Sequence, residues 1–217
     1  MRPKRVVVVA GTGTEVGKTF VGAAIAHEVM TQRRTVAARK PAQSFAPDDA
    51  STDASVLGAA TSEDAEAICP PHRWYPIPMA PPMAAAALGR DPFTTEDLAR
   101  EVDASWPDND TPLDLGLVET AGGAWSPQAS DGCHVGHFAD ALAADGVLLV
   151  ADAGLGVINA VRGAIAAFGN ARPVIVMLNR YNENDGLHAA NRDWLMHEDH
   201  FTVVVDVGEA ATALTNL

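Results

Sequence analysis

One glycine-rich segment carries the clearest combination of residues for chemistry. Residues 11–19 read Gly-Thr-Gly-Thr-Glu-Val-Gly-Lys-Thr, and they lie between an apolar run and a helical pattern. Glycine lets consecutive backbone N–H groups curl around phosphate oxygens, and the helix that follows directs its positive end at the same point. Lys18 can place its charge on the β- and γ-phosphates, and the Thr19 hydroxyl can bind Mg²⁺. The segment predicts a site for a nucleoside triphosphate with Mg²⁺, built from Gly13, Thr14, Glu15, Val16, Gly17, Lys18 and Thr19.

Two residues depart from the usual form of such a loop. The common spacing is Gly-x4-Gly-Lys-Ser/Thr, whereas here Thr12 takes the place of the first glycine and Gly11 stands one residue earlier. Glu15 would repel phosphate if its carboxylate pointed inward, so we expect it to face away, toward a substrate amine or a subunit partner. The alternative, a glycine-rich turn with an incidental lysine, fits less well because the strand, the spacing and the helix start agree.

Three charged residues lie where further site residues are expected. Lys40 follows a second apolar run, and open α/β sheets bind ligands at the carboxyl ends of their strands. From its position alone, Lys40 is either a site residue or a surface lysine before a proline turn. Glu119 ends another apolar run, from which an acid commonly binds Mg²⁺ directly or through water. Asp53 stands at a helix start, where an acid also favours the helix dipole without any further role.

The remaining pattern indicates the elements that position these residues. Short apolar runs at residues 6–10, 35–39, 115–119, 147–152, 174–179 and 202–207 alternate with helical patterns at 18–32 and 159–168. Thr94 and Asp97 form a capping box for a further helix that ends near Trp106. The runs are continuously apolar, which is typical of a parallel sheet covered on both faces. We therefore predict one α/β domain over residues 1–217, with irregular segments at 69–82 and 107–112.

Composition narrows the classes of protein. The chain has 217 residues and a formal net charge of −13, from 15 basic and 28 acidic residues. This balance argues against a nucleic-acid partner, which would require a basic face. No apolar run approaches the roughly 18 residues that cross a bilayer, so we expect no membrane partner. Cys69 and Cys133 lack metal-ligand spacing, which favours a reducing, cytoplasmic setting.

Four segments, in order, resemble the dethiobiotin synthetase family of P-loop NTPases. They are Thr14 to Thr19, Lys40-Pro41 with Ser44, Glu119-Thr120-Ala121-Gly122-Gly123, and Leu155-Gly156-Val157-Ile158-Asn159. The resemblance covers about residues 6–180. It implies a P-loop NTPase fold and a homodimer that converts 7,8-diaminononanoate, CO₂ and ATP into dethiobiotin, ADP and phosphate. One amine becomes a carbamate, the γ-phosphate activates it, and the neighbouring amine closes the ureido ring.

The resemblance also implies a role for each matching residue. Lys40, Lys18 and Thr14 would be catalytic, with the Lys40 ammonium on the carbamate and on the charge that develops during phosphoryl transfer. Thr19, Asp53 and Glu119 would bind Mg²⁺. Asn179 would read the nucleotide base. Substrate contacts would come from Ser44 and Gly122, and from Gly156, Val157 and Asn159 of the other subunit, which would bind the substrate carboxylate.

Several residues differ from the family pattern. Thr120 replaces the first glycine of a Glu-Gly-Ala-Gly-Gly turn, and a β-branched residue resists positive φ, so we expect an altered backbone there. Arg180 and Tyr181 follow Asn179 where an acid is more usual, and the C-terminal base-contacting segment is not recognisable, which predicts loose base selectivity. We expect Cys133, His134 and His137 to be structural. Met79 and Met83 are expected to fill gaps.

Three other functions compete with this interpretation. A relative of cobyrinate amide synthases would share the nucleotide-binding fold but needs a glutamine-hydrolysing domain, for which 217 residues leave no room. An ATP-driven switch of the partitioning or metal-cluster-carrier class usually has an additional lysine early in the loop, where this chain has Gly11, Thr12 and Gly13. An altered homologue that acts on a different diamine is the third alternative.

Overall fold

The computed structural model describes residues 1–108 and 110–217. The acidic turn expected at 107–112 therefore lies partly outside the described residues. The strands are β1 (Arg5–Gly11), β2 (Val36–Arg39), β3 (Gln43–Ser44), β4 (Trp74–Tyr75), β5 (Leu115–Glu119), β6 (Gly146–Asp152), β7 (Val174–Asn179) and β8 (Thr202–Val204). The helices are α1 (Lys18–Thr31), α2 (Asp53–Thr61), α3 (Ala65–Ile68), α4 (Pro81–Ala87), α5 (Thr95–Ser105), α6 (Val135–Ala141), α7 (Val157–Ile165), α8 (Gly186–His197) and α9 (Val207–Thr215), with a 3₁₀ turn η1 (Pro71–Arg73).

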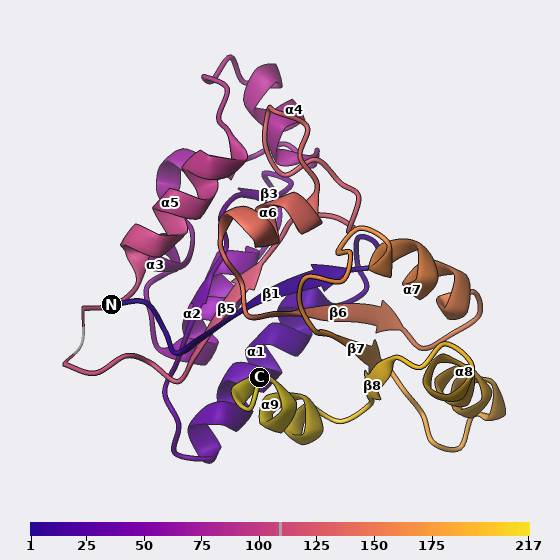
Figure 1. The fold of residues 1–217 in the computed structure, drawn as a ribbon. Helices are drawn as coiled ribbons and strands as arrows, with labels where there is room; N and C mark the ends of the chain where they lie inside the picture. The colour runs from indigo at the N-terminus through magenta and orange to yellow at the C-terminus, as the bar shows by residue number, and fades with distance from the viewer. Residues whose placement is uncertain (109) are drawn as a thin grey trace.

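A six-stranded sheet in the order β2-β5-β1-β6-β7-β8 forms the centre of the molecule (Figure 1). Every neighbouring pair is parallel, so the carboxyl ends of all the strands lie at one edge. β3 and β4 form a separate parallel pair beside this edge. The α/β fold with a mostly parallel sheet, predicted from the alternating runs, is confirmed.

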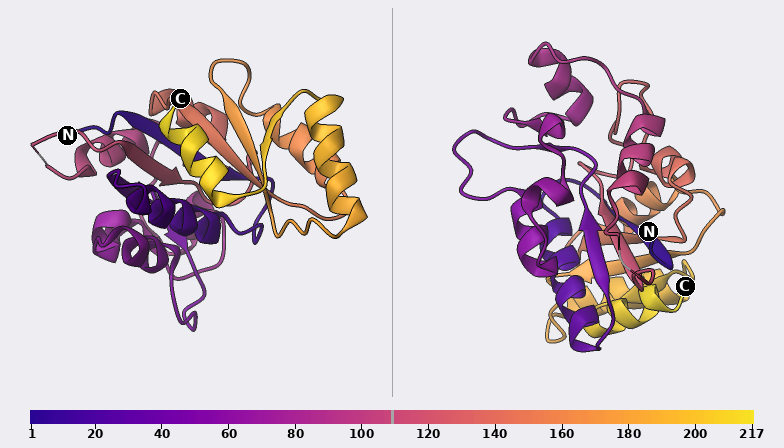
Figure 2. Two further views of the ribbon diagram at one scale, coloured as in Figure 1. Left: turned by 90° about the horizontal axis from the view of Figure 1, so that it is seen from below. Right: turned by 90° about the vertical axis from the view of Figure 1, so that its left-hand side faces the viewer.

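Both faces of the sheet are covered, which explains the continuously apolar strands. Alternate residues of β1 enter opposite cores: Val8 packs in a cluster with residues of α5, α6, α7 and α8, and Val9 packs in a cluster with residues of α1, α2, α3 and α9. Figures 1 and 2 show these helices on the two sides of the sheet. The buried sheet gives the loops at its carboxyl edge a rigid base.

Two expectations about the elements were wrong in detail. The run at 202–207 ends as a strand at Val204, because Asp206 accepts hydrogen bonds from the backbone N–H groups of Gly208 and Glu209 and so caps α9. The segment 69–82 is not wholly irregular: it contains η1 and β4, and Pro81 opens α4. Proline is favoured at a first helical position, where its missing N–H has no partner to lose.

Helix starts follow the capping chemistry in the sequence. Thr94 and Asp97 form the expected capping box of α5, and Thr52 with Ser55 forms a second one at α2. The second box matters for the site because it fixes Asp53 as the first residue of α2. None of the helices in the part of the chain that is described is long and apolar enough to cross a membrane.

Candidate active site

The phosphate loop runs from the end of β1 to the start of α1, and residues of β6 and β7 contact its backbone. Gly17 has φ +92°, and a Cβ there would lie 2.2 Å from Asn179 Nδ2, so only glycine fits. Thr12 takes the first glycine position without a positive φ, and its N–H donates to Val150 O at 3.0 Å. Gly11 makes the close approach instead, since a Cβ there would lie 2.8 Å from Gly13 O. The position that requires the first glycine of the loop is therefore Gly11, one residue earlier than in the usual motif, and Thr12 fits at the usual position.

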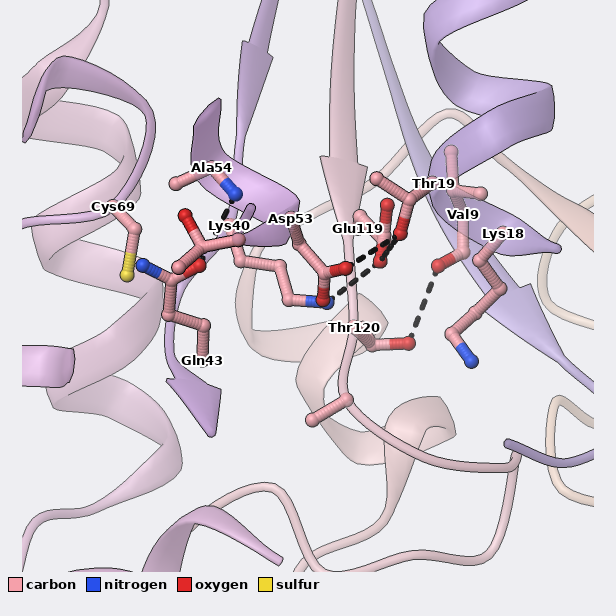
Figure 3. Close-up of polar contacts among 12 residues, drawn as sticks. Val9, Lys18, Thr19, Lys40, Gln43, Asp53, Ala54, Cys69, Glu119 and Thr120 are labelled. Atoms are coloured by element: carbon pink, nitrogen blue, oxygen red, sulfur yellow. Dashed lines mark hydrogen bonds and ion pairs between the residues drawn. The ribbon is translucent and has the colours of Figure 1, made fainter. Parts of the chain in front are cut away.

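Four side chains from four different elements meet beside this loop (Figure 3). Lys40 Nζ lies 2.6 Å from Asp53 Oδ2 and 2.6 Å from Glu119 Oε1. The Thr19 hydroxyl lies 2.9 Å from Asp53 Oδ1 and 2.9 Å from Glu119 Oε1. Thr19 lies in the first turn of α1, Lys40 directly follows β2, Asp53 is the first residue of α2, and Glu119 ends β5. We call Thr19, Lys40, Asp53 and Glu119 the charged cluster.

Burial and mutual charge set the protonation of this cluster. Burial opposes the charged form of Lys40, but the charges and hydrogen bonds of Glu119 and Asp53 outweigh it and raise the pKa of the ammonium. Burial likewise opposes ionised Asp53, yet Lys40 lowers the pKa of that carboxyl. Burial raises the pKa of Glu119. Burial, followed by repulsion from Lys40, lowers the pKa of Lys18, whose Nζ donates to Gly13 O at 3.1 Å. Two ammonium groups thus face two carboxyl groups.

The oxygen atoms of the cluster fit Mg²⁺. Glu119 Oε2 is buried and has no hydrogen-bond partner, which leaves an acceptor free for a cation. No group of three or more His, Cys, Asp or Glu side chains able to hold a metal occurs among the described residues. Mg²⁺ does not require one, because it commonly takes one or two carboxylates and completes its shell with phosphate and water. Since Lys18 and Lys40 together balance the charges of Asp53 and Glu119, a triphosphate would also need its own cation here.

Most of the predicted site residues line one cavity of about 330 Å³. Those brought together are Thr14, Glu15, Gly17, Lys18, Thr19, Lys40, Ser44, Asp53, Glu119 and Gly122. Gly13 and Asn159 line a neighbouring hollow that shares Thr14 with the first. Gly156 and Val157 line neither, and Leu155 beside them is 91% exposed. Within one chain, the segment expected to bind the carboxylate is therefore separate from the charged cluster.

The turn after β5 places Thr120 in a conformation that suits a β-branched residue. Thr120 is buried without a positive φ, and both its N–H and its hydroxyl donate to Val9 O, at 3.1 and 3.3 Å. The left-handed residue is Gly122, with φ +67°, where a Cβ would lie 2.4 Å from Ser126 Oγ. The β-branched residue therefore fits at its position without strain, and the position that requires glycine is Gly122, two residues later.

The end of β7 contacts the phosphate loop through two adjacent residues. Asn179 Nδ2 donates to Val16 O at 2.9 Å, and Arg180 Nη2 donates to Glu15 O at 3.2 Å. Arg180 also forms an ion pair with Asp152 at 2.7 Å. Glu15 and Arg180 both have positive φ, 59° and 57°. The sequence did not indicate the Arg180 contact, and the reading of a base by Asn179 stays a prediction.

Sequence reasoning also missed Gln43. Its side chain is fully buried, and Oε1 accepts a hydrogen bond from Ala54 N at 3.1 Å (Figure 3). Gln43 stands next to Ser44 in β3, and Ala54 follows Asp53 in α2. The bond therefore joins the strand that carries Ser44 to the helix that carries Asp53. The only signal in the sequence is that Gln43 precedes Ser44.

The fold and this site define a P-loop nucleotide-binding protein. The AAA domain family matches residues 5–211. The fold resembles that of the signal recognition particle receptor FtsY from Elizabethkingia anophelis, with a TM-score of 0.55 and 13% identity over 99% of this chain and 66% of that one. It also resembles that of cobyrinic acid a,c-diamide synthase from Mycobacterium smegmatis, with a TM-score of 0.53 and 14% identity over 98% of this chain and 91% of that one. At these identities the likeness concerns the fold alone.

Sequence relatives narrow the family. The chain is 40% identical to the ATP-dependent dethiobiotin synthetase BioD of Streptomyces coelicolor, over 71% of this chain and 61% of that protein. It is 36% identical to BioD of Rhodococcus erythropolis, over 75% and 68%, and 34% identical to BioD of Anaeromyxobacter dehalogenans, over 95% and 93%. The chain thus spans about three fifths of the Streptomyces relative and nearly all of the Anaeromyxobacter one. It belongs to the ATP-dependent dethiobiotin synthetase family, as its motifs predicted.

Proposed function

We propose that this protein is an ATP- and Mg²⁺-dependent ligase that forms the ureido ring of dethiobiotin from 7,8-diaminononanoate and CO₂. The observation that carries the proposal is the charged cluster, which lies in one cavity with the phosphate loop, Thr14, Ser44 and Gly122. A single cavity for a triphosphate and a second substrate is what a phosphorylating ligase requires. We place the reaction in the cytoplasm, where ATP is available.

The reaction has three bond-making steps. One amine nitrogen attacks the carbon of CO₂ and loses a proton, which gives a carbamate. A carbamate oxygen then attacks the γ-phosphorus, and the bond from that phosphorus to the ADP oxygen breaks. Finally the second amine attacks the carbamate carbon, loses a proton, and expels inorganic phosphate as the carbon–oxygen bond breaks. The products are one ring, one ADP and one phosphate.

The residues of the chain serve these steps mainly by placing charge. Lys18 and the N–H groups of the loop bind the transferring phosphoryl group, where preorganised donors act most strongly. Lys40 keeps its proton, because its pKa is raised, and supplies a cation for the carbamate. Thr14, Ser44 and Gly122 line the opening beyond it. Mg²⁺ held by Thr19, Asp53 and Glu119 would neutralise charge on the phosphate oxygens.

The active form is proposed to be a homodimer with shared sites. Gly156, Val157 and Asn159 lie at the N-terminus of α7, preceded by the exposed Leu155. A helix N-terminus favours a carboxylate, and an isologous interface would bring this segment of one chain to the charged cluster of the other. The diamine would then bind with its amines at one chain and its carboxylate at the partner.

Product analysis tests the proposed function. The protein is incubated with ATP, Mg²⁺, bicarbonate and 7,8-diaminononanoate, and dethiobiotin and ADP are quantified by mass spectrometry. We expect equal amounts of both, with no ADP beyond background when the diamine is omitted. Diamine-independent ADP release would point instead to a switch ATPase. Absence of ring product alongside diamine-dependent ADP release would indicate an enzyme with a different reaction.

A further inference from the structure

The cavity that holds the charged cluster continues into a second hollow of about 440 Å³. The walls of both contain Thr14, Glu15, Ser44, Ala121 and Gly122. The walls of the second hollow also include the segment Pro78, Met79, Ala80 and Pro81, which does not line the first. A ligand whose reactive end lies beside Lys40 can therefore extend past Ser44 and reach this segment without leaving the cavity.

The backbone of this wall, formed by residues 78–81, is restrained. Ile77 N donates to Tyr75 O at 2.8 Å, and Met79 N donates to Ile77 O at 2.8 Å. Pro78 and Pro81 each restrict their own φ, and Pro81 starts α4, which packs against β3 and β4 (Figure 1). Little conformational freedom remains to be lost when a ligand binds along it, so contacts there contribute to affinity with small entropic cost.

The chemistry of this wall is aliphatic. From Ile77 to Leu88 the sequence contains no charged residue. The expectation that Met79 and Met83 fill gaps was wrong, because the two residues are 44% and 57% exposed. Methionine is flexible and polarisable and adapts to apolar partners of irregular shape. An exposed methionine on a rigid apolar wall, facing a cavity with two ammonium and two carboxyl groups at its other end, suits a molecule that is polar at one end and aliphatic at the other.

We propose that Met79 is a specificity-determining residue that binds the aliphatic chain of the substrate, with Pro78 and Pro81 as its support. The ligand class is a vicinal diamine that bears several methylene groups, with its amines at Lys40 and Thr14 and its chain along Met79. The proposal rests on the proposed function for the position of the amines. Met79 sets how strongly binding depends on chain length and takes no part in phosphoryl transfer.

Binding of a homologous series tests this role apart from turnover. The affinities of 2,3-diaminobutane, 2,3-diaminohexane and 2,3-diaminononane, which lack a carboxylate, are measured by calorimetry in the presence of Mg²⁺ and a non-hydrolysable ATP analogue. For the wild type we expect affinity to rise about twofold to fourfold per methylene, the gain from removing such a group from water. Met79→Gln should flatten this dependence, and Met79→Leu should retain it.

Met83→Gln is the matched control. Met83 lies four residues further along, in α4, is 57% exposed, and is absent from the walls of the hollow, so its substitution should leave the chain-length dependence at the wild-type value. An equal dependence in Met79→Gln and wild type would overturn the proposal, as would a wild type indifferent to chain length. Length-dependent binding without ring closure would contradict the proposed function and leave the role of Met79 standing.

Discussion

The carboxyl edge of the sheet has two halves that differ in how complete they are. At β2, β5 and β1, Lys40 and Glu119 are each 2% exposed. The residues of the charged cluster are joined to one another by ion pairs and hydrogen bonds of 2.6 to 2.9 Å. At β6, β7 and β8, Leu155 is exposed, and Arg180 and Asp152 form a solvent-accessible ion pair. One half is preorganised within a single chain. The other presents groups whose partners would be a nucleotide base or a second chain.

The closed half should contain the residues whose loss is most severe. We expect Lys18→Ala to reduce kcat/KM by at least about a hundredfold, the scale for removing one preorganised donor to a developing charge. Steady-state turnover and calorimetric triphosphate binding are the measurements. Lys4→Ala is the matched control, because Lys4 is exposed and pairs with Asp114 far from the cavity. Near-normal turnover of the Lys18 variant would contradict the assignment of the loop.

A second prediction concerns the two acids of the cluster. Asp53→Asn and Glu119→Gln should each raise the Mg²⁺ concentration needed for half-maximal activity, since each removes one proposed charged ligand of a shared ion. Their effects on kcat/KM should be strongly non-additive in the double variant, because residues that act through one group lose their function together. Additive losses of activity with unchanged Mg²⁺ titrations would show that the two acids do not bind one shared ion.

Mixing variants tests whether the open half of one chain completes the closed half of another. Lys40→Ala and Asn159→Ala homodimers should each have low ring-forming activity. After random exchange of subunits, half of the dimers would be mixed, and each would hold one intact site, so activity should recover to about a quarter of wild type. Light scattering checks the dimer. A monomer, or a mixture no more active than its parts, would confine the site to one chain.

The smallest predicted effect concerns the nucleotide base, which the open half would bind. Only Val205 and Asp206 separate β8 from α9, so no long loop follows β8 to cover a base, and the amide of Asn179 is already bonded to Val16. A site with few hydrogen bonds to a base discriminates weakly. CTP and GTP should therefore support kcat/KM within about tenfold of ATP, or roughly 1.4 kcal/mol. A preference for ATP beyond a hundredfold would show that Arg180 or Tyr181 reads adenine.

The same two halves differ in how far the sequence predicts them. Lys18, Lys40, Asp53 and Glu119 each stand at the end of an apolar run or the start of a helix, and parallel strands bring such ends to one edge. Their meeting in one cavity was therefore predictable, although their individual roles stay predictions. The bond from Gln43 to Ala54 was not predictable, because it depends on the relative placement of β3 and α2.

Other features of the backbone cannot be predicted from the pattern of apolar residues. Arg180 and Glu15 adopt positive φ although neither is glycine, a conformation that tertiary contacts impose and that propensity argues against. α4 was hidden because consecutive prolines indicate a loop, whereas Pro81 opens a helix. Thr120 resists positive φ, as its branched side chain predicts, and the left-handed conformation falls on Gly122; whether the backbone differs from that of other family members stays a prediction.

The fate of one oxygen atom tests the central claim most directly. In the proposed reaction a carbamate oxygen attacks the γ-phosphorus and stays on phosphate when the ring closes. The enzyme is mixed with ATP, Mg²⁺, 7,8-diaminononanoate and ¹⁸O-labelled CO₂ in unlabelled water and quenched before the label exchanges. Mass spectrometry of the inorganic phosphate should then show one ¹⁸O atom per molecule, and none when the diamine is omitted. Unlabelled phosphate released together with dethiobiotin would rule out the phosphorylated carbamate.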